Sequence, residues 1–222
     1  MPAPRLRNIL PFALCLLTAT AVQAEPGRKV YEQGGADPAA IACITCHGED
    51  AFGMAAAGFP RLAGQSAAYL SKQLADFKSG SRSNPVMQPI ASALDADEIV
   101  AVTTMLAAMP APQTRRSKRA DLVDSLGAQI ALRGAWERNI PECVACHGPG
   151  GVGVGDHFPP LAGQSAEYLS AELNAWRSGL RNNDPNQLMG HIARSLTDEE
   201  ISAVTAYFAG LGESSASSEL SE

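Results

Sequence analysis

The sequence predicts an all-α protein in which one small helical domain occurs twice in tandem. The main observation is an internal repeat, since the segment FPRLAGQSA at residues 59–67 recurs as FPPLAGQSA at residues 158–166. The apolar residues after each segment have the three-to-four-residue spacing of a helix, and no part of the chain shows the alternating pattern of a strand. A repeat of about 100 residues is too long for a solenoid, so it indicates a duplicated domain.

Each copy contains the pentapeptide C-x-x-C-H, which is the attachment motif of a c-type haem. The residues are Cys43, Cys46, His47, Cys143, Cys146 and His147. Two cysteines three positions apart on a helical turn can each form a thioether to one haem vinyl group, and the following histidine then reaches the iron. The sequence therefore predicts two covalently bound haem c groups, each with a histidine as axial ligand.

Other uses of these cysteines fit the pattern less well. Paired C-x-x-C motifs of one zinc site usually stand some 15–20 residues apart, whereas these pairs begin at positions 43 and 143. A thioredoxin-like redox pair belongs to a βαβ unit, and no strand pattern flanks either motif. Two disulfides remain an alternative in an oxidising compartment, although the two-residue gap gives a strained ring.

Within each copy the sequence predicts three main helices. The first is expected at residues 27–33 in copy one and at residues 126–137 in copy two. The second follows the shared Gly-Gln-Ser and ends at Gly80 or Gly179, because glycine readily adopts the left-handed conformation that closes a helix.

The third helix of each copy begins with a capping box. Asp95 is followed three residues later by Glu98, and Thr197 is followed in the same way by Glu200. An apolar stripe then follows in both copies, and Pro110 is expected to stop the helix of copy one.

Residues 1–24 have the pattern of a secretory signal peptide, with cleavage expected after Ala24. Arg5 and Arg7 precede a short apolar run that ends in small residues, as in exported proteins. The run is shorter than the roughly 20 residues that span a membrane, so a retained anchor is the less favoured alternative. Cys15 lies in this run, so cleavage leaves the motif cysteines as the only ones of the mature chain.

Removal of the signal segment leaves 15 basic and 23 acidic residues, a formal net charge of −8. Such a chain has no basic footprint for nucleic acid, so we expect no nucleic-acid partner. The two domains are expected at residues 25–110 and 125–213, with a Ser- and Glu-rich disordered tail at 214–222. The linker between them, residues 111–124, contains Pro112 and four basic residues. It could dock an acidic partner, but a solvated connector is the favoured interpretation.

The second axial ligand decides whether each iron is closed for electron transfer or open to oxygen and peroxide. Met87 and Met189 occupy equivalent positions, each in a predicted loop before the last helix. Met54 has no counterpart, and Met105 falls on a helix stripe where core packing explains it. The sequence therefore favours Met87 and Met189 as ligands, with His191 as the one rival in the second copy.

The Phe-Pro-x-Leu segment after each motif has an expected role beside the haem. A histidine that binds haem iron usually donates its other ring N–H to a carbonyl group, and Pro60 and Pro159 stand where such a carbonyl is needed. Leu62 and Leu161 would then pack on the haem face. The alternative is an ordinary turn proline followed by a core leucine.

Taken together, these residues resemble the dihaem cytochrome c4 family, over residues 27–211. The resemblance rests on the two C-x-x-C-H motifs, the two FPxLAGQS segments and the two methionines ahead of the last helices. It implies two tandem cytochrome c-like domains related by a pseudo-twofold axis, each wrapped around one covalent haem c, with the haem propionate edges approaching at the interface. It also implies that His47 and Met87 ligate the first iron and that His147 and Met189 ligate the second.

The resemblance further implies a periplasmic electron carrier, soluble or loosely associated with the membrane surface. The leading prediction is an electron-transfer protein without catalytic residues, working between a quinol-cytochrome c reductase and a terminal oxidase. One alternative is the dihaem subunit of a periplasmic dehydrogenase, such as a flavocytochrome that oxidises sulfide. Another is a dihaem peroxidase, against which the paired methionines argue because that enzyme needs an exchangeable site on one iron.

Overall fold

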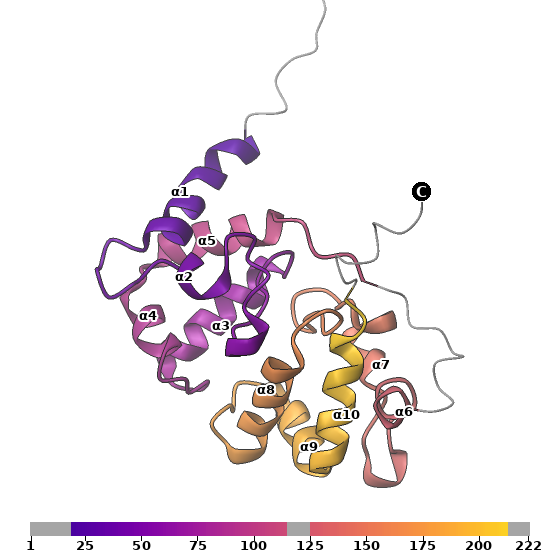
Figure 1. Cartoon of the computed structure of the whole chain (residues 1–222). Coiled ribbons are helices and arrows are strands. Elements are labelled where there is room, and N and C mark those ends of the chain that lie inside the picture. Colours follow the sequence, from indigo (N-terminus) through magenta and orange to yellow (C-terminus); the bar gives the residue numbers. More distant parts are fainter. Residues whose placement is uncertain (1–18, 115–124, 213–222) are drawn as a thin grey trace, which may run out of the picture.

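The computed structural model describes residues 19–114 and 125–212 of the chain and is helical throughout. Within these residues no strand forms, and β-type pairing is limited to isolated bridges. The all-α prediction is therefore confirmed. Figure 1 shows the two copies as separate helical domains, indigo to magenta and orange to yellow, lying against one another.

The two domains contain the same succession of α-helices and differ in their 3₁₀ turns. The first consists of α1 (Ala19–Gln33), α2 (Ile44–His47), a 3₁₀ turn η1 (Ala55–Ala57), α3 (Ala67–Ser79), α4 (Met87–Ala93) and α5 (Ala96–Ala108). The second consists of α6 (Leu126–Arg133), η3 (Trp136–Arg138), α7 (Cys143–His147), η4 (Pro149–Gly151), α8 (Ala166–Ser178), η5 (Pro185–Gln187), α9 (Leu188–Ser195) and α10 (Asp198–Ala209).

The capping signals of the sequence are present in the structure. Asp95 accepts from the amide of Glu98 while the Glu98 carboxylate accepts from the amide of Asp95, and Thr197 and Glu200 repeat this exchange. Each box satisfies amides at the start of its helix, α5 or α10, that would otherwise lack partners. Gly80 and Gly179 end α3 and α8 in the left-handed conformation, as expected.

The first helix of each domain differs from the prediction at one end. Helix α1 begins at Ala19, eight residues earlier than expected, and continues across Ala24. Helix α6 ends at Arg133 instead of residue 137, because Gly134 adopts a φ of +69° and Trp136 starts a separate 3₁₀ turn. The apolar residues after Gly134 therefore belong to a turn and do not extend the helix.

In each domain the first helix packs across the last helix, α1 across α5 and α6 across α10. Gly27 of α1 faces α5 so closely that an added Cβ would lie 2.3 Å from the backbone oxygen of Ala101. Gly127 of α6 faces α10 in the same way, 2.1 Å from the oxygen of Ala203. Any side chain would hold the helices apart, so these equivalent glycines permit the crossing. Residues of both helices at each crossing belong to the hydrophobic core of that domain.

The rest of the predicted organisation is only partly covered by the structure. Most of the predicted signal segment (1–18), most of the linker (115–124), residue 213 and the predicted tail (214–222) lie outside the described residues. Among the helices that are described, none has the length and apolar character required to cross a bilayer.

Candidate functional site

Each C-x-x-C-H motif forms one short helix that turns its histidine inward. His47 ends α2 and is 6 % exposed, and His147 ends α7 and is 7 % exposed. Gly48 and Gly148 follow with φ near +80°, which stops both helices at the histidine. The local fold therefore buries the predicted ligand directly after the second cysteine in both domains.

A hydrogen bond to the backbone of a proline fixes each histidine ring. Nδ1 of His47 lies 2.9 Å from the carbonyl oxygen of Pro60, and Nδ1 of His147 lies 2.8 Å from that of Pro159. Because a carbonyl only accepts, Nδ1 carries the proton and Nε2 keeps its lone pair for a metal. Burial lowers the pKa of both histidines, and the proline carbonyls oppose this only in part, so the rings are neutral as ligands must be.

None of the four motif cysteines is joined to another in a disulfide. Burial raises the pKa of Cys43 to about 11 and that of Cys143 to about 12. A catalytic redox pair has the opposite property, a thiolate stabilised by a lowered pKa. The described residues also contain no group of three or more His, Cys, Asp and Glu side chains placed to hold a metal ion. The cysteines thus remain available to form thioethers.

The two candidate methionines are at the start of short helices, whereas the sequence suggested loops. Met87 is the first residue of α4, whose start is fixed because the Asn84 side chain accepts from the amides of Val86 and Met87 at 3.0 and 2.9 Å. Met189 is the second residue of α9. Both side chains are half-buried, but neither belongs to the hydrophobic cluster of its domain.

The competing side chains are placed differently. His191 is exposed, and Met54 is 41 % exposed at the start of η1. Met105 is 7 % exposed and belongs to the core of the first domain. Leu62 and Leu161 pack against the cores of their domains, which is the contact that the alternative of a core leucine predicts.

Buried donors without partners provide a test of whether a haem fits. In the described part of the chain, Nε of Arg61, Nε1 of Trp176 and the hydroxyl of Tyr207 are buried and have no hydrogen-bond partner. Such orphaned groups are costly unless something absent from the chain satisfies them. A haem supplies carboxylate oxygens as its propionates, so the residues present fit the group that the motifs predict.

The domains meet at a buried cluster that the sequence analysis did not identify. Gln73 of α3, Arg82, Glu172 of α8 and Arg181 form this arginine cluster. Both arginines are at least 94 % buried. The signal for it was present in the sequence, because Gly80-Ser81-Arg82 recurs as Gly179-Leu180-Arg181 at the ends of α3 and α8.

The backbone at this interface has local twofold symmetry. Arg82 and Arg181 form an antiparallel bridge, in which the amide of Ser83 donates to the oxygen of Leu180 at 2.7 Å. The amide of Asn182 donates to the oxygen of Ser81 at 2.8 Å. Equivalent positions therefore pair with one another, as expected for two copies related by a pseudo-twofold axis.

Arg61 connects the domains at a second place. The Gln164 side chain accepts from the Arg61 amide at 3.0 Å and donates to the Arg61 carbonyl at 3.1 Å. The Arg61 guanidinium donates to the carbonyl of Ala162 at 3.2 Å. The equivalent of Arg61 in the second copy is Pro160, so this contact has no symmetric counterpart.

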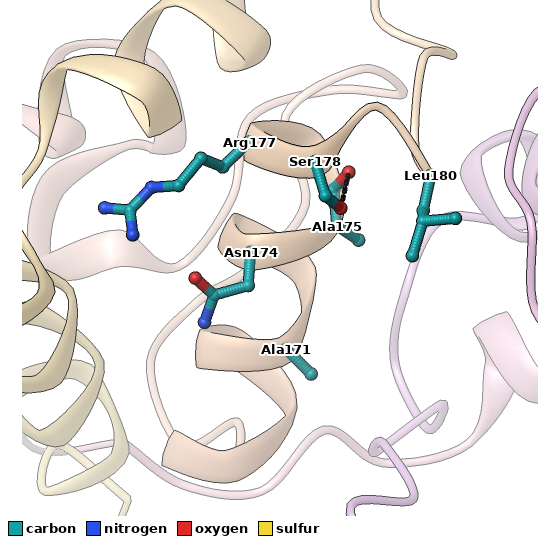
Figure 2. A pocket seen from close by; sticks show the side chains of 6 residues that line it. All are labelled: Ala171, Asn174, Ala175, Arg177, Ser178 and Leu180. Carbon is teal, nitrogen blue, oxygen red and sulfur yellow. Dashed lines mark hydrogen bonds between the residues drawn. The ribbon is translucent and has the colours of Figure 1, made fainter.

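Figure 2 shows a pocket along α8 whose lining contains neither motif histidine. It is lined by Ala171, Asn174, Ala175, Arg177, Ser178 and Leu180. The Ser178 hydroxyl donates to the Ala175 carbonyl at 3.2 Å, and the Arg177 side chain donates to the backbone oxygens of Ala193 and Leu196. The pocket thus presents no free reactive group.

Comparison with known proteins gives consistent matches. The family model described as Cytochrome c matches twice, at residues 24–124 and 127–212. The chain is 64 % identical over 198 residues to a thiosulfate dehydrogenase electron acceptor of Stutzerimonas stutzeri, covering 89 % of this chain and 92 % of the relative. It is 38 % identical over 184 residues to a cytochrome c4 of Thiocapsa roseopersicina, covering 82 % of this chain and 93 % of the relative.

Solved structures agree with the sequence matches. A thiosulfate dehydrogenase (TsdBA) from Marichromatium purpuratum superposes with a TM-score of 0.75 at 44 % identity, and the match covers 84 % of this chain but only 40 % of that longer one. Reduced cytochrome c4 from Pseudomonas stutzeri superposes with a TM-score of 0.69 at 29 % identity, covering 84 % of this chain and 97 % of the other.

Proposed function

We propose, from the premise that this chain belongs to the cytochrome c family and is a dihaem cytochrome of the c4 type, that it accepts electrons from a thiosulfate-oxidising dehydrogenase. Electron transfer itself follows from family membership. The donor is the part that we propose. The observation that carries it is the 64 % identity, over 89 % of this chain, to a thiosulfate dehydrogenase electron acceptor.

The chemistry is that of the haem iron, which takes up one electron in passing from ferric to ferrous. In our proposal the two cysteine pairs hold one haem in each domain. His47 and His147 then ligate iron through Nε2, and the proline carbonyls keep the rings in the required tautomer. Met87 and Met189 close the opposite positions. Two closed sites favour electron transfer over reaction with peroxide, and this argues against the peroxidase alternative.

A dehydrogenase as donor is one of the alternatives that the sequence left open. The match to the thiosulfate dehydrogenase TsdBA supports it, because this chain is similar to a part that makes up 40 % of that protein's chain. Coupling of two thiosulfate ions through a sulfur–sulfur bond releases two electrons, and a chain with two one-electron sites can take both. A flavocytochrome that oxidises sulfide is less well supported than a thiosulfate-oxidising donor.

A second candidate is the leading function predicted from the sequence, transfer from a quinol-cytochrome c reductase to a terminal oxidase. It is supported by the cytochrome c4 relatives, among them one from Thiocapsa roseopersicina at 38 % identity. The two roles are compatible if the terminal oxidase is the acceptor in both. We place the protein in the periplasm in either case, since c-type haem attachment and the predicted signal segment both require export.

The test is direct reduction of the holoprotein by a purified thiosulfate dehydrogenase. The ferric protein is mixed with a catalytic amount of the enzyme and with thiosulfate, and the visible haem bands are followed. We expect full reduction of both haems that depends on enzyme and thiosulfate together. Absence of reduction, with rapid reduction by a quinol-cytochrome c reductase and quinol, would favour the second candidate instead.

A further inference from the structure

Gln73 and Glu172 contact the same two arginines, but only Glu172 is charged. Oε1 of Gln73 accepts from Nη1 of Arg82 at 3.1 Å and from Nη2 of Arg181 at 3.0 Å. The Glu172 carboxylate bridges the same two arginines, with Oε1 2.8 Å from Nη2 of Arg82 and Oε2 bonded to Nη1 of Arg181. Positions 73 and 172 are equivalent in the repeat, so an amide stands where symmetry places a second carboxylate.

The charges of the cluster do not cancel. Two guanidinium groups face one carboxylate, and the three side chains are 7, 5 and 16 % exposed. Burial by itself would raise the pKa of Glu172, but the charges of Arg82 and Arg181 outweigh it and hold that pKa below its ordinary value. The carboxylate is therefore ionised at neutral pH. Charges buried in this way are screened far less than surface charges, so they act on their surroundings at longer range.

The cluster is built on the two segments that lead to the proposed iron ligands. Arg82 precedes Met87 by five residues, and Arg181 precedes Met189 by eight. The Arg181 guanidinium also stacks on the ring of Trp176, 3.8 Å from its centre, and Nε1 of Trp176 is one of the orphaned donors that fit a haem. The cluster is therefore connected along the chain to the proposed methionine ligand of each site.

We propose that Glu172 and its uncharged counterpart Gln73 make the two haem sites electrostatically unequal, so that the position of this one carboxylate sets part of the difference between their reduction potentials. Each site gains one electron as its iron passes from ferric to ferrous, the electron coming from the donor protein. A negative charge opposes that gain, and opposes it more at the nearer site. The inference rests on haem in both domains and does not depend on which donor is correct.

The experiment is a potentiometric titration of the isolated holoprotein, followed by its visible spectrum and resolved into two one-electron steps. Four proteins are compared: wild type, Glu172→Gln, Gln73→Glu and the double variant that exchanges the two residues. Glu172→Gln should raise the mean of the two potentials and Gln73→Glu should lower it. Both variants place the same side chain at positions 73 and 172, so both should give the same difference between the two potentials.

The double variant is the decisive protein, because it moves the carboxylate to the other domain without changing the total charge. We expect the mean of its two potentials to equal that of wild type. Compared with the two single variants, the difference between its two potentials should change in one direction, and that of wild type in the opposite direction. This change in the difference between the two potentials should be about 59 mV. For a one-electron couple, that corresponds to about a tenfold change in the ratio of ferrous to ferric haem at a fixed potential.

Equal potential differences in all four proteins, or a double variant that reproduces the wild-type difference, would overturn the proposal. Glu172→Gln leaves two buried arginines without a carboxylate and can prevent the domains from assembling. The other two variants retain a carboxylate between the arginines and carry the test alone. Glu167→Gln is the matched control, since it makes the same charge change at an exposed position of α8 and should shift the mean less. No dehydrogenase is present, so this result and the test of the donor can fail independently.

Discussion

Nδ1 of His147 lies 2.8 Å from the carbonyl oxygen of Pro159. The same contact joins His47 and Pro60 at 2.9 Å, and the two histidines are almost equally buried. Both domains therefore hold the proposed histidine ligand in the same way. We therefore expect differences between the two proposed sites to arise elsewhere, at the proposed methionine ligands and at the interface between the domains.

We expect each proposed methionine ligand to account for half of the far-red charge-transfer band between methionine sulfur and ferric iron. Met87→Ala and Met189→Ala should each remove about half of its intensity and open one iron to carbon monoxide after reduction. The measurements are the ferric far-red spectrum and the ferrous spectrum with carbon monoxide.

His191→Ala is the control for the second site. His191 is exposed and lies two residues after Met189, so its removal should leave the band at full intensity. A wild-type protein with only half of the expected intensity, restored to full intensity in His191→Ala, would identify His191 as the ligand of the second iron.

Gln164→Ala should weaken the contact between the domains at Arg61. The Gln164 side chain is the acceptor of the Arg61 amide at 3.0 Å, and a buried amide without a partner costs about 1–3 kcal/mol. Hydrogen exchange at the Arg61 amide should therefore accelerate by roughly 5- to 150-fold. The amide of Leu62, bonded within its own domain to Ala51 at 2.8 Å, serves as the internal reference. Equal acceleration at both amides would instead indicate global destabilisation.

The Glu172 carboxylate should give the interface a characteristic dependence on pH. Its pKa is below the ordinary value of 4.5 in the folded protein, because Arg82 and Arg181 outweigh the opposing effect of burial. A group with a depressed folded pKa stabilises the protein above its unfolded pKa, and the stabilisation is lost as the pH falls through the folded pKa. Wild type should thus exceed Glu172→Gln in unfolding free energy at pH 7, by about 3 kcal/mol.

Urea denaturation between pH 7 and pH 3 measures this difference. It should be constant at the upper end and shrink below about pH 4.5, the ordinary value of the group. Glu167→Gln, at an exposed position of the same helix, should differ little from wild type at any pH. A difference between wild type and Glu172→Gln that is the same at pH 7 and pH 3 would contradict the assignment of its stabilisation to charge.

Sequence reasoning succeeded where the determinant is local. The C-x-x-C-H motifs, the capping boxes at Asp95 and Thr197 and the glycine ends of α3 and α8 depend on residues within one helical turn of each other. It failed where the determinant is a contact between segments distant in the chain. The arginine cluster joins residues about 100 positions apart, and the periodicity of either segment alone does not reveal that Gln73 and Glu172 bridge the same arginines.

The crossing glycines illustrate the same limit within one domain. Gly27 and Gly127 are equivalent in the repeat, but a glycine near the start of a helix indicates nothing by itself. Its meaning appears only when α5 or α10 is placed against it. The repeat held the signal, because two glycines kept in register, where the neighbouring residues of the two copies differ, indicate a shared steric requirement.

Gly127→Ala should therefore destabilise the second domain. Its new Cβ would lie 2.1 Å from the backbone oxygen of Ala203 and 3.0 Å from Cβ of Tyr207, so α6 and α10 must separate. Such overpacking costs about 1–3 kcal/mol. Both tryptophans of the chain, Trp136 and Trp176, belong to this domain, so denaturant unfolding followed by tryptophan fluorescence reports on it directly. Gly210→Ala is the matched control, since its φ of −68° suits alanine and its nearest contact is 3.3 Å. If Gly127→Ala kept the wild-type midpoint, close contact at this crossing would not be required for the fold.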